Sequence, residues 1–302
     1  MKLQFFTYDV FTAEKFGGNP LAIVIGADGL TPQQMQTIAR EFNLSETIFV
    51  MRPDDLGNTA KVRIFFPTAE IPFAGHPTIG CAIFLAEQRQ KPGCPFETEI
   101  RLEEVAGLVP VKVTRIGGVP RAMFTAPVTP YRVDVPVSGA AELASATGLT
   151  ETDIGFDGHR PGVFEGGPRF LYVPVNSRAA LAASRPIEPH WSAVTKACGV
   201  DAAYVYTRGG DAAGTHFRAR MYSPTAGIPE DPATGSATAL LATQLLASEG
   251  LSDGTHRWQL EQGYEMGRPS DLVLEADVGG GTLNAVRVAG QAVQIMSGML
   301  EL

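Results

Sequence analysis

Alternating apolar and polar residues predict a strand-rich first half with short connections. Glycine and proline separate most of the apolar stretches, as expected for turns between short strands. The strands predicted in this half cover residues 3–11, 21–25, 47–51, 61–66, 97–102, 108–116 and 121–125. The pattern therefore indicates a sheet-based domain that ends near residues 127–136.

Two helices interrupt these strands. Residues 31–34, Thr-Pro-Gln-Gln, supply a capping threonine, a proline at the first helical position and a capping-box glutamine. Met35, Ile38 and Phe42 follow at helical spacing. A second helix is predicted for residues 77–88, which follow a loop rich in proline and glycine. Both helices lie in the first half of the chain.

The sequence contains an internal repeat. Pro67–Pro72 recurs as Pro224–Pro229, His76–Ala82 matches Asp231–Ala237, and Leu44–Val50 matches Val200–Tyr206. All three matches keep a nearly constant offset of about 156 residues across helix, strand and loop. We therefore predict a duplicated domain with pseudo-twofold symmetry.

The start of one helix in each half is predicted to bind an anion. His76 precedes Pro77 and Asp231 precedes Pro232, so each proline is expected at the first helical position with a capping residue before it. The free N–H groups of a helix start favour a carboxylate, and the small residues Gly75, Gly80, Gly235 and Ser236 would let it approach the backbone closely. We expect the two helix starts to face one active site between the halves.

The symmetry is broken where ionisable residues occur. Glu46 of the first half aligns with Ala202, and His76 aligns with Asp231. Glu46, His76 and Asp231 together are the groups that general acid–base catalysis requires. Taken singly, Asp231 also fits a plain helix cap, and Glu46 a solvated residue before a strand. It is the repeat that favours a common catalytic role.

Charge and composition narrow the possible partners. The 302 residues carry a formal net charge of −8 and form no basic cluster, so nucleic acid is not an expected partner. No apolar run reaches the length of a membrane span, and no membrane association is expected. Cys81, Cys94 and Cys198 are too few and too scattered for a disulfide framework. A soluble, cytoplasmic protein is predicted.

The motifs of other chemistries are missing from the sequence. It has no nucleophile elbow, phosphate-binding loop, dinucleotide-binding glycine motif or zinc-binding H-E-x-x-H. The run Gly279–Gly281 lies between candidate strands and is interpreted as a turn. These competing chemistries therefore fit the sequence poorly.

Several motifs together resemble those of one known family, the PhzF-like phenazine-biosynthesis isomerases, which share the diaminopimelate epimerase fold. The resemblance covers essentially the whole chain. Its motifs are Asp9–Phe11, Gly18–Pro20, Asn43–Thr47, Ala74–Thr78, Glu230–Ser236, Gln262–Gly263, Gly267–Ser270 and Ser297–Gly298. As a set they are highly specific for this family.

The resemblance implies an α+β fold of two pseudo-symmetric domains, each an antiparallel, β-barrel-like sheet around a central helix. It places residues 1–127 in the first domain together with a returning strand at about 290–302, and residues 128–289 in the second. Family members commonly form homodimers, and a homodimer is expected here.

The resemblance also implies an isomerase that works without cofactor or metal on a small carboxylate-bearing substrate. Glu46 would move a proton from one carbon to another, with His76 and Asp231 positioning the substrate and assisting. Gly75, Gly235 and Ser236 would supply backbone or hydroxyl hydrogen bonds to the substrate carboxylate. Related epimerases use a pair of cysteines, which this chain lacks at the helix starts; Cys81 is expected in the core. Two alternatives stay open: an amino-acid or hydroxy-acid epimerase or tautomerase, and a binding protein without turnover.

Overall fold

The computed structural model describes all 302 residues, which divide into two compact units. Unit 1 comprises Met1–Pro127, Arg268–Asp271 and Val288–Leu302, and unit 2 comprises Val128–Gly267 and Leu272–Arg287. Both units consist mostly of strands with few helices. The predicted α+β class is confirmed.

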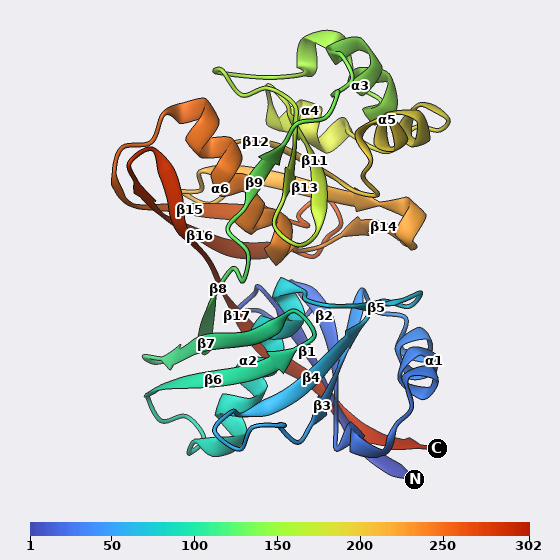
Figure 1. Cartoon of the computed structure of the whole chain (residues 1–302), viewed down its shortest axis with the longest axis vertical. Coiled ribbons are helices and arrows are strands. Elements are labelled where there is room, and N and C mark those ends of the chain that lie inside the picture. Colours follow the sequence, from blue (N-terminus) through green and yellow to red (C-terminus); the bar gives the residue numbers. More distant parts are fainter. The chain divides into compact units, whose positions relative to one another are not determined.

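Unit 1 contains two helices among nine strands (Figure 1). In chain order its elements are β1 (Lys2–Val10), β2 (Asn19–Ile25), the 3-10 turn η1 (Ala27–Gly29), α1 (Pro32–Phe42), β3 (Glu46–Met51), β4 (Ala60–Phe65), β5 (Glu70–Ile71), α2 (Gly75–Arg89), β6 (Phe96–Glu104), β7 (Gly107–Arg115), β8 (Arg121–Thr125) and the second part of β17 (Thr282–Glu301).

The strands of unit 1 close into a barrel around α2. Pairing runs from β1 through β2, β3, β4, β6, β7 and β8 to β17, which pairs again with β1. Helix α2 packs against β1, β2, β3, β6, β7 and β8, and its residues from Gly75 to Phe84 are all buried. A helix that is apolar on every side requires such an enclosure. Figure 1 shows α2 among these strands, with α1 outside them.

Helix α1 begins as predicted. The hydroxyl of Thr31 accepts from Gln34 N at 3.2 Å, and Thr31 N donates to the side chain of Gln34 at 2.9 Å. Met35 and Ile38 pack with strand residues in a separate core cluster. Asn43 ends the helix in the left-handed conformation, with φ of 51°. The capping box and the apolar spacing are both confirmed.

Unit 2 repeats this design with additional helices (Figure 1). Its elements are β9 (Tyr131–Val133), α3 (Ala140–Thr147), η2 (Glu151–Asp153), β10 (Gly162–Glu165), β11 (Arg169–Pro174), α4 (Arg178–Ala183), α5 (His190–Cys198), β12 (Ala203–Arg208), β13 (Phe217–Ser223), η3 (Pro224–Ala226), β14 (Ile228–Asp231), α6 (Gly235–Glu249), β15 (Gly254–Gln262), β16 (Ser270–Gly279) and the first part of β17. Helix α6 packs against β9 and β10, as α2 packs within unit 1.

The sheet of each unit was predicted to be antiparallel, but each also contains parallel strand pairs. In unit 1, β2 pairs with β3 and β4 with β6 in parallel. In unit 2, β11 pairs with β12 and β13 with β15 in parallel. Parallel neighbours need a crossover between them, and helices supply it: α1 between β2 and β3, and α2 between β4 and β6.

One contact pattern repeats almost residue by residue in the two units. Glu103 accepts hydrogen bonds from Asp54 N, Asp55 N and Asn58 Nδ2 at 2.7–2.9 Å. Glu261 accepts from the backbone N–H groups of Asp211 and Ala212 and from the Thr215 hydroxyl at 2.8–3.0 Å. Each glutamate is the next-to-last residue of its strand, β6 or β15. The duplication seen in the sequence is therefore present in the hydrogen bonding.

The two central helices begin at different positions from those predicted. Helix α2 starts at Gly75 with Ala74 as its cap, so Pro77 is its third residue. The missing N–H of Pro77 costs nothing there, because the first turn needs no helical donors. Helix α6 starts at Gly235 with Thr234 as its cap. The predictions of His76 and Asp231 as caps are therefore wrong.

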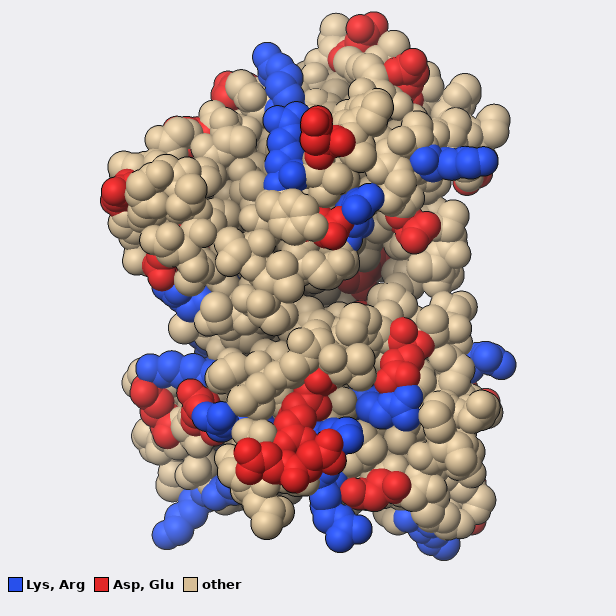
Figure 2. Space-filling view, in the orientation of Figure 1, with Lys and Arg blue, Asp and Glu red and all other residues tan.

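The face of the molecule in Figure 2 carries acidic and basic side chains next to one another in both units. Ion pairs of the chain include Lys61 with Asp54 and Lys112 with Glu97. None of the helices has the combination of length and hydropathy that crossing a membrane would require.

Candidate active site

Glu46 begins strand β3, directly after the turn that ends α1. It lies opposite Leu21 in the parallel pairing with β2. The residue is 7% exposed, so a carboxyl group is held almost out of water at the start of a strand. This burial contradicts the alternative of a solvated residue. Ionisable side chains are rarely buried without a partner, so a neighbouring group is expected beside the Glu46 carboxyl.

His76 lies beside Glu46. It is the second residue of α2 and is 3% exposed. Its Nδ1 atom lies 3.2 Å from Oε2 of Glu46 and 3.4 Å from Nδ2 of Asn19, the first residue of β2. A helix start and two strand starts therefore bring these three buried side chains of unit 1 together.

The imidazole of His76 is neutral. Burial lowers the pKa of His76 from 6.5 to about 3, because the charged ring loses its hydration, and the backbone carbonyl of Pro20 offsets this only in part. The approach of His76 Nδ1 to Glu46 Oε2 is therefore a close contact between a carboxyl group and a neutral ring, not an ion pair.

The loop that carries Asn19 is fixed by a residue distant in sequence. Arg268 Nη2 pairs with Asp9 Oδ1 at 2.6 Å, and Arg268 Nε donates to the carbonyl of Gly18 at 2.8 Å. Gly18 has a φ of 61°, and a Cβ there would lie 2.4 Å from the carbonyl oxygen of Val10. Arginine and glycine together therefore determine where Asn19 begins β2.

Asp231 lies in unit 2 as the last residue of β14, paired with Met221 of β13. It is 4% exposed, and its Oδ2 accepts from the Thr234 hydroxyl at 2.6 Å. Gln262 donates to the Asp231 carbonyl at 2.8 Å and accepts from Thr234 N at 3.1 Å. These bonds hold residues 231–234 as a turn, which is why α6 starts only after them.

The three predicted carboxylate-binding residues all lie in the first turn of a central helix. Gly75 is the first residue of α2, and Gly235 and Ser236 are the first two of α6. The first turn of a helix presents N–H groups without helical acceptors. Each unit therefore offers donors of the kind that bind a carboxylate.

Comparison with known proteins identifies the family. Residues 8–298 match the model of the PhzC-PhzF family, described as phenazine biosynthesis-like proteins. An uncharacterized isomerase of Mesorhizobium japonicum is 39% identical over 300 residues, with 98% of each chain covered. The chain belongs to the PhzC-PhzF family.

Two further relatives extend this result. The trans-2,3-dihydro-3-hydroxyanthranilate isomerase of Pseudomonas aeruginosa is 36% identical over 295 residues, with 98% of each chain covered. A PhzF-family phenazine biosynthesis protein of Bacillus anthracis superposes with a TM-score of 0.88 over the full length of both chains at 24% identity, which supports the fold. The protein is a PhzF-family isomerase.

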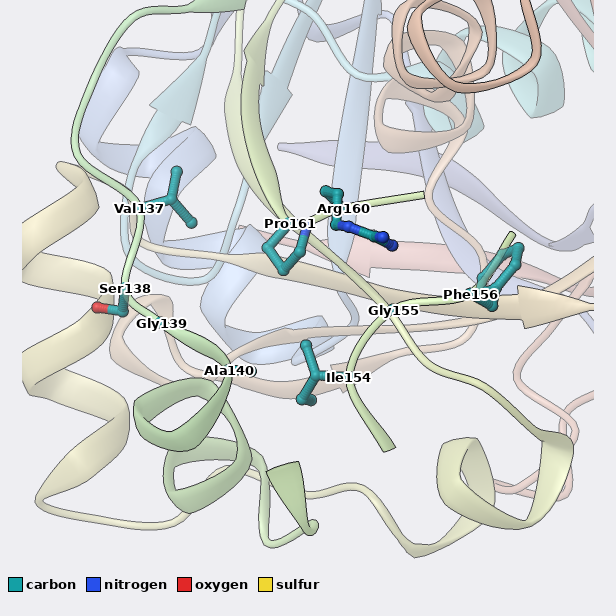
Figure 3. A pocket seen from close by; sticks show the side chains of 9 residues that line it. All are labelled: Val137, Ser138, Gly139, Ala140, Ile154, Gly155, Phe156, Arg160 and Pro161. Carbon is teal, nitrogen blue, oxygen red and sulfur yellow. The ribbon is translucent and has the colours of Figure 1, made fainter. Parts of the chain in front are cut away.

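One cavity of this isomerase lies away from the predicted site residues. A cavity of about 470 Å³ in unit 2 lies at the start of α3 (Figure 3). Ile154, Phe156, Arg160 and Pro161 contribute side chains to its wall. Neither Asp231 nor the start of α6 lines it. The structure also brings together no group of three or more His, Cys, Asp or Glu side chains that could hold a metal ion.

The sequence of this PhzF-family chain did not predict Asn19 as a site residue. It appeared only within the Gly18–Pro20 motif, because an asparagine after glycines is a common turn residue. The pairing of Asp9 with Arg268 was missed as well, since 259 residues separate them. Cys81, by contrast, is fully buried in α2 as expected.

Proposed function

We propose that this isomerase moves a carbon-bound proton on a small carboxylate-bearing substrate, with Glu46 as the acid–base group. The observation that supports this most directly is the contact of the buried Glu46 carboxyl with the neutral His76 ring at 3.2 Å. A base that takes a proton from carbon must be partly freed from water, and Glu46 is.

The proposed reaction needs no oxidant or reductant. The carboxylate of Glu46 takes a proton from one substrate carbon, and the electron pair of the broken C–H bond shifts the adjacent double bond. The resulting carboxylic acid returns the proton to a different carbon. The product is an isomer of the substrate, and Glu46 regains its starting state.

His76 supports this cycle through its contact with the Glu46 carboxyl, and Asn19 holds the His76 ring. Because the pKa of His76 is about 3, its ring stays neutral and accepts or donates a hydrogen bond as the Glu46 proton comes and goes. The substrate carboxylate is proposed to bind at a helix start, at Gly75 of α2 or at Gly235 and Ser236 of α6. The role of Asp231 in assisting transfer stays a prediction, as does the homodimer.

The first substrate to test is trans-2,3-dihydro-3-hydroxyanthranilate, which names the activity of the relative from Pseudomonas aeruginosa. Turnover by the wild type is compared with Glu46→Gln, which keeps the shape of the side chain but cannot carry the proton. Glu41→Gln is the matched control, because Glu41 lies nearby on α1 and is exposed.

We expect Glu46→Gln to lose at least about 10²-fold in kcat, the lower end of what a general base contributes, and Glu41→Gln to match the wild type. Equal turnover in both variants would contradict the proposed role of Glu46.

A further inference from the structure

A second buried glutamate of unit 1 lies beneath the start of α2. Glu104 is the last residue of β6 and is 7% exposed. Its Oε1 lies 2.7 Å from the hydroxyl oxygen of Thr78, which in turn lies 2.7 Å from the carbonyl oxygen of Ala74, the cap of α2. Glu104 therefore reaches the helix start through one threonine.

This chain of three oxygens contains too few protons if Glu104 is ionised. The Thr78 hydroxyl has one hydrogen, and both of its neighbours would then be acceptors only. One of the two 2.7 Å contacts would be left without a proton. If Glu104 is a carboxylic acid, it donates to Thr78, Thr78 donates to Ala74, and both contacts are hydrogen bonds.

The surroundings of Glu104 also favour the neutral acid. Its Oε2 has no hydrogen-bond partner, and no Lys, Arg or His forms an ion pair with it. The basic residues of the neighbouring strands are engaged by other carboxylates: Lys61 by Asp54, Arg63 by Glu70, Lys112 by Glu97 and Arg115 by Glu87. A buried carboxylate without a cation is costly.

The titratable group of α2 on which Glu104 acts is the Cys81 thiol. Burial raises its pKa strongly and Glu104 raises it further, so it stays uncharged. Burial likewise raises the pKa of Glu104 from 4.5 to about 8, although the Thr78 hydroxyl opposes the rise.

The duplication supplies an independent observation. Strands β6 and β15 are both nine residues long, pair in parallel with β4 and β13, and end in Glu103-Glu104 and Glu261-Gln262. Because Glu103 and Glu261 make matching loop contacts, Gln262 is the counterpart of Glu104. Gln262 lies beneath the approach to α6, where it donates to Thr234 Oγ1 at 3.0 Å and to the Asp231 carbonyl.

A glutamine has the shape of a protonated glutamic acid and never ionises. Unit 2 therefore supports its helix start with a permanently neutral donor and acceptor. We propose that Glu104 is a positioning residue that does the same in unit 1 as a neutral carboxylic acid, donating its proton to Thr78 and thereby holding Ala74 and the first turn of α2.

The catalytic consequence rests on the proposed function. The first turn of α2 carries Gly75 and His76, so loss of the Glu104 proton breaks the bond beneath it and places a negative charge nearby. A carboxylate substrate is then bound more weakly. In alkaline solution kcat/KM of the wild type is expected to fall, through KM more than kcat.

The first test uses the protein alone. Infrared spectroscopy distinguishes the C=O stretch of a carboxylic acid from that of a carboxylate, and the spectrum is recorded across a pH titration. We expect a carboxylic-acid band at neutral pH that disappears with a midpoint near pH 8. Glu104→Gln should lack this band. Glu103→Gln, the matched control next to it, should keep it, because hydrogen bonds lower the pKa of Glu103.

A second test measures kcat and KM on trans-2,3-dihydro-3-hydroxyanthranilate. Glu104→Gln should keep the neutral-pH kcat/KM within about threefold of the wild type and lose the alkaline fall, whereas Glu104→Ala should raise KM at every pH. Absence of the carboxylic-acid band, or equal damage by Gln and Ala, would overturn the proposal. Because the infrared band needs no turnover, failure of the proposed function leaves this test of Glu104 intact.

Discussion

Replacing Glu104 by glutamine should make the protein more stable at alkaline pH than the wild type. In the folded state the pKa of Glu104 is raised from 4.5 to about 8 by burial. A raised pKa means that the folded state holds its proton more tightly than the unfolded chain. The stabilising contribution is complete below pH 4.5 and is lost as the pH rises through about 8.

The magnitude follows from linkage. Each unit of pKa corresponds to about 1.4 kcal/mol, so the wild type loses on the order of 5 kcal/mol of unfolding free energy across this window. A glutamine makes the same hydrogen bond and has no proton to lose. The difference in unfolding free energy between Glu104→Gln and the wild type should therefore grow in favour of the variant as the pH rises.

The assay is urea denaturation of both proteins at about pH 5, 6.5 and 8. The unfolding free energy extrapolated to zero urea is compared at each pH. Glu103→Gln serves as the control, and its difference from the wild type should stay constant over this pH range. Hydrogen bonds lower the pKa of Glu103, so its contribution is present above its ordinary pKa of 4.5 and is lost in acid. A difference between Glu104→Gln and the wild type that stays constant with pH would refute the reasoning.

Three other substitutions test separate parts of the structure. Burial lowers the pKa of His76 from 6.5 to about 3, so the wild type should lose on the order of 5 kcal/mol of unfolding free energy as the pH falls across this range. His76→Gln should flatten that loss in acid denaturation curves. Arg268→Ala should lower the unfolding free energy by about 2–3 kcal/mol, because Asp9 and the loop before Asn19 lose their charged donor. The same variant should reduce kcat, and an unchanged kcat would contradict the positioning role of Arg268. Gly80→Ala should cost about 1–3 kcal/mol in thermal unfolding, because the new Cβ would lie 2.6 Å from a methyl carbon of Leu21, and a variant as stable as the wild type would contradict this packing.

The fold was predictable where a local pattern carries its own physical cause. The helix α1 was found because its capping box, its proline and its apolar spacing agree, and most strands of unit 1 were found from alternation. The barrel closure was not readable in this way, since β17 pairs with β1 and β8 from the far end of the chain. Pairing between distant segments leaves no periodicity in either of them.

The candidate site was predictable only where the repeat exposed it. Glu46 and His76 attracted attention because the duplicated half lacks them, and the structure places them 3.2 Å apart. Asp231 was found for the same reason, but the start of α6 was misplaced because the bonds from Gln262 act across 31 residues. Glu104 was missed, although aligning the ends of β6 and β15 would have set it against Gln262.

The central claim is that the Glu46 carboxyl carries a carbon-bound proton, and deuterium exchange tests it most directly. Trans-2,3-dihydro-3-hydroxyanthranilate is incubated in D2O with the wild type, Glu46→Gln and Glu41→Gln, and deuterium at the substrate carbons is followed by NMR. With the wild type and Glu41→Gln the account predicts isomerised product, with deuterium at the receiving carbon wherever the Glu46 proton exchanges with solvent before it is returned. With Glu46→Gln it predicts neither product nor deuterium. Deuterium incorporation by Glu46→Gln at the wild-type rate would contradict it.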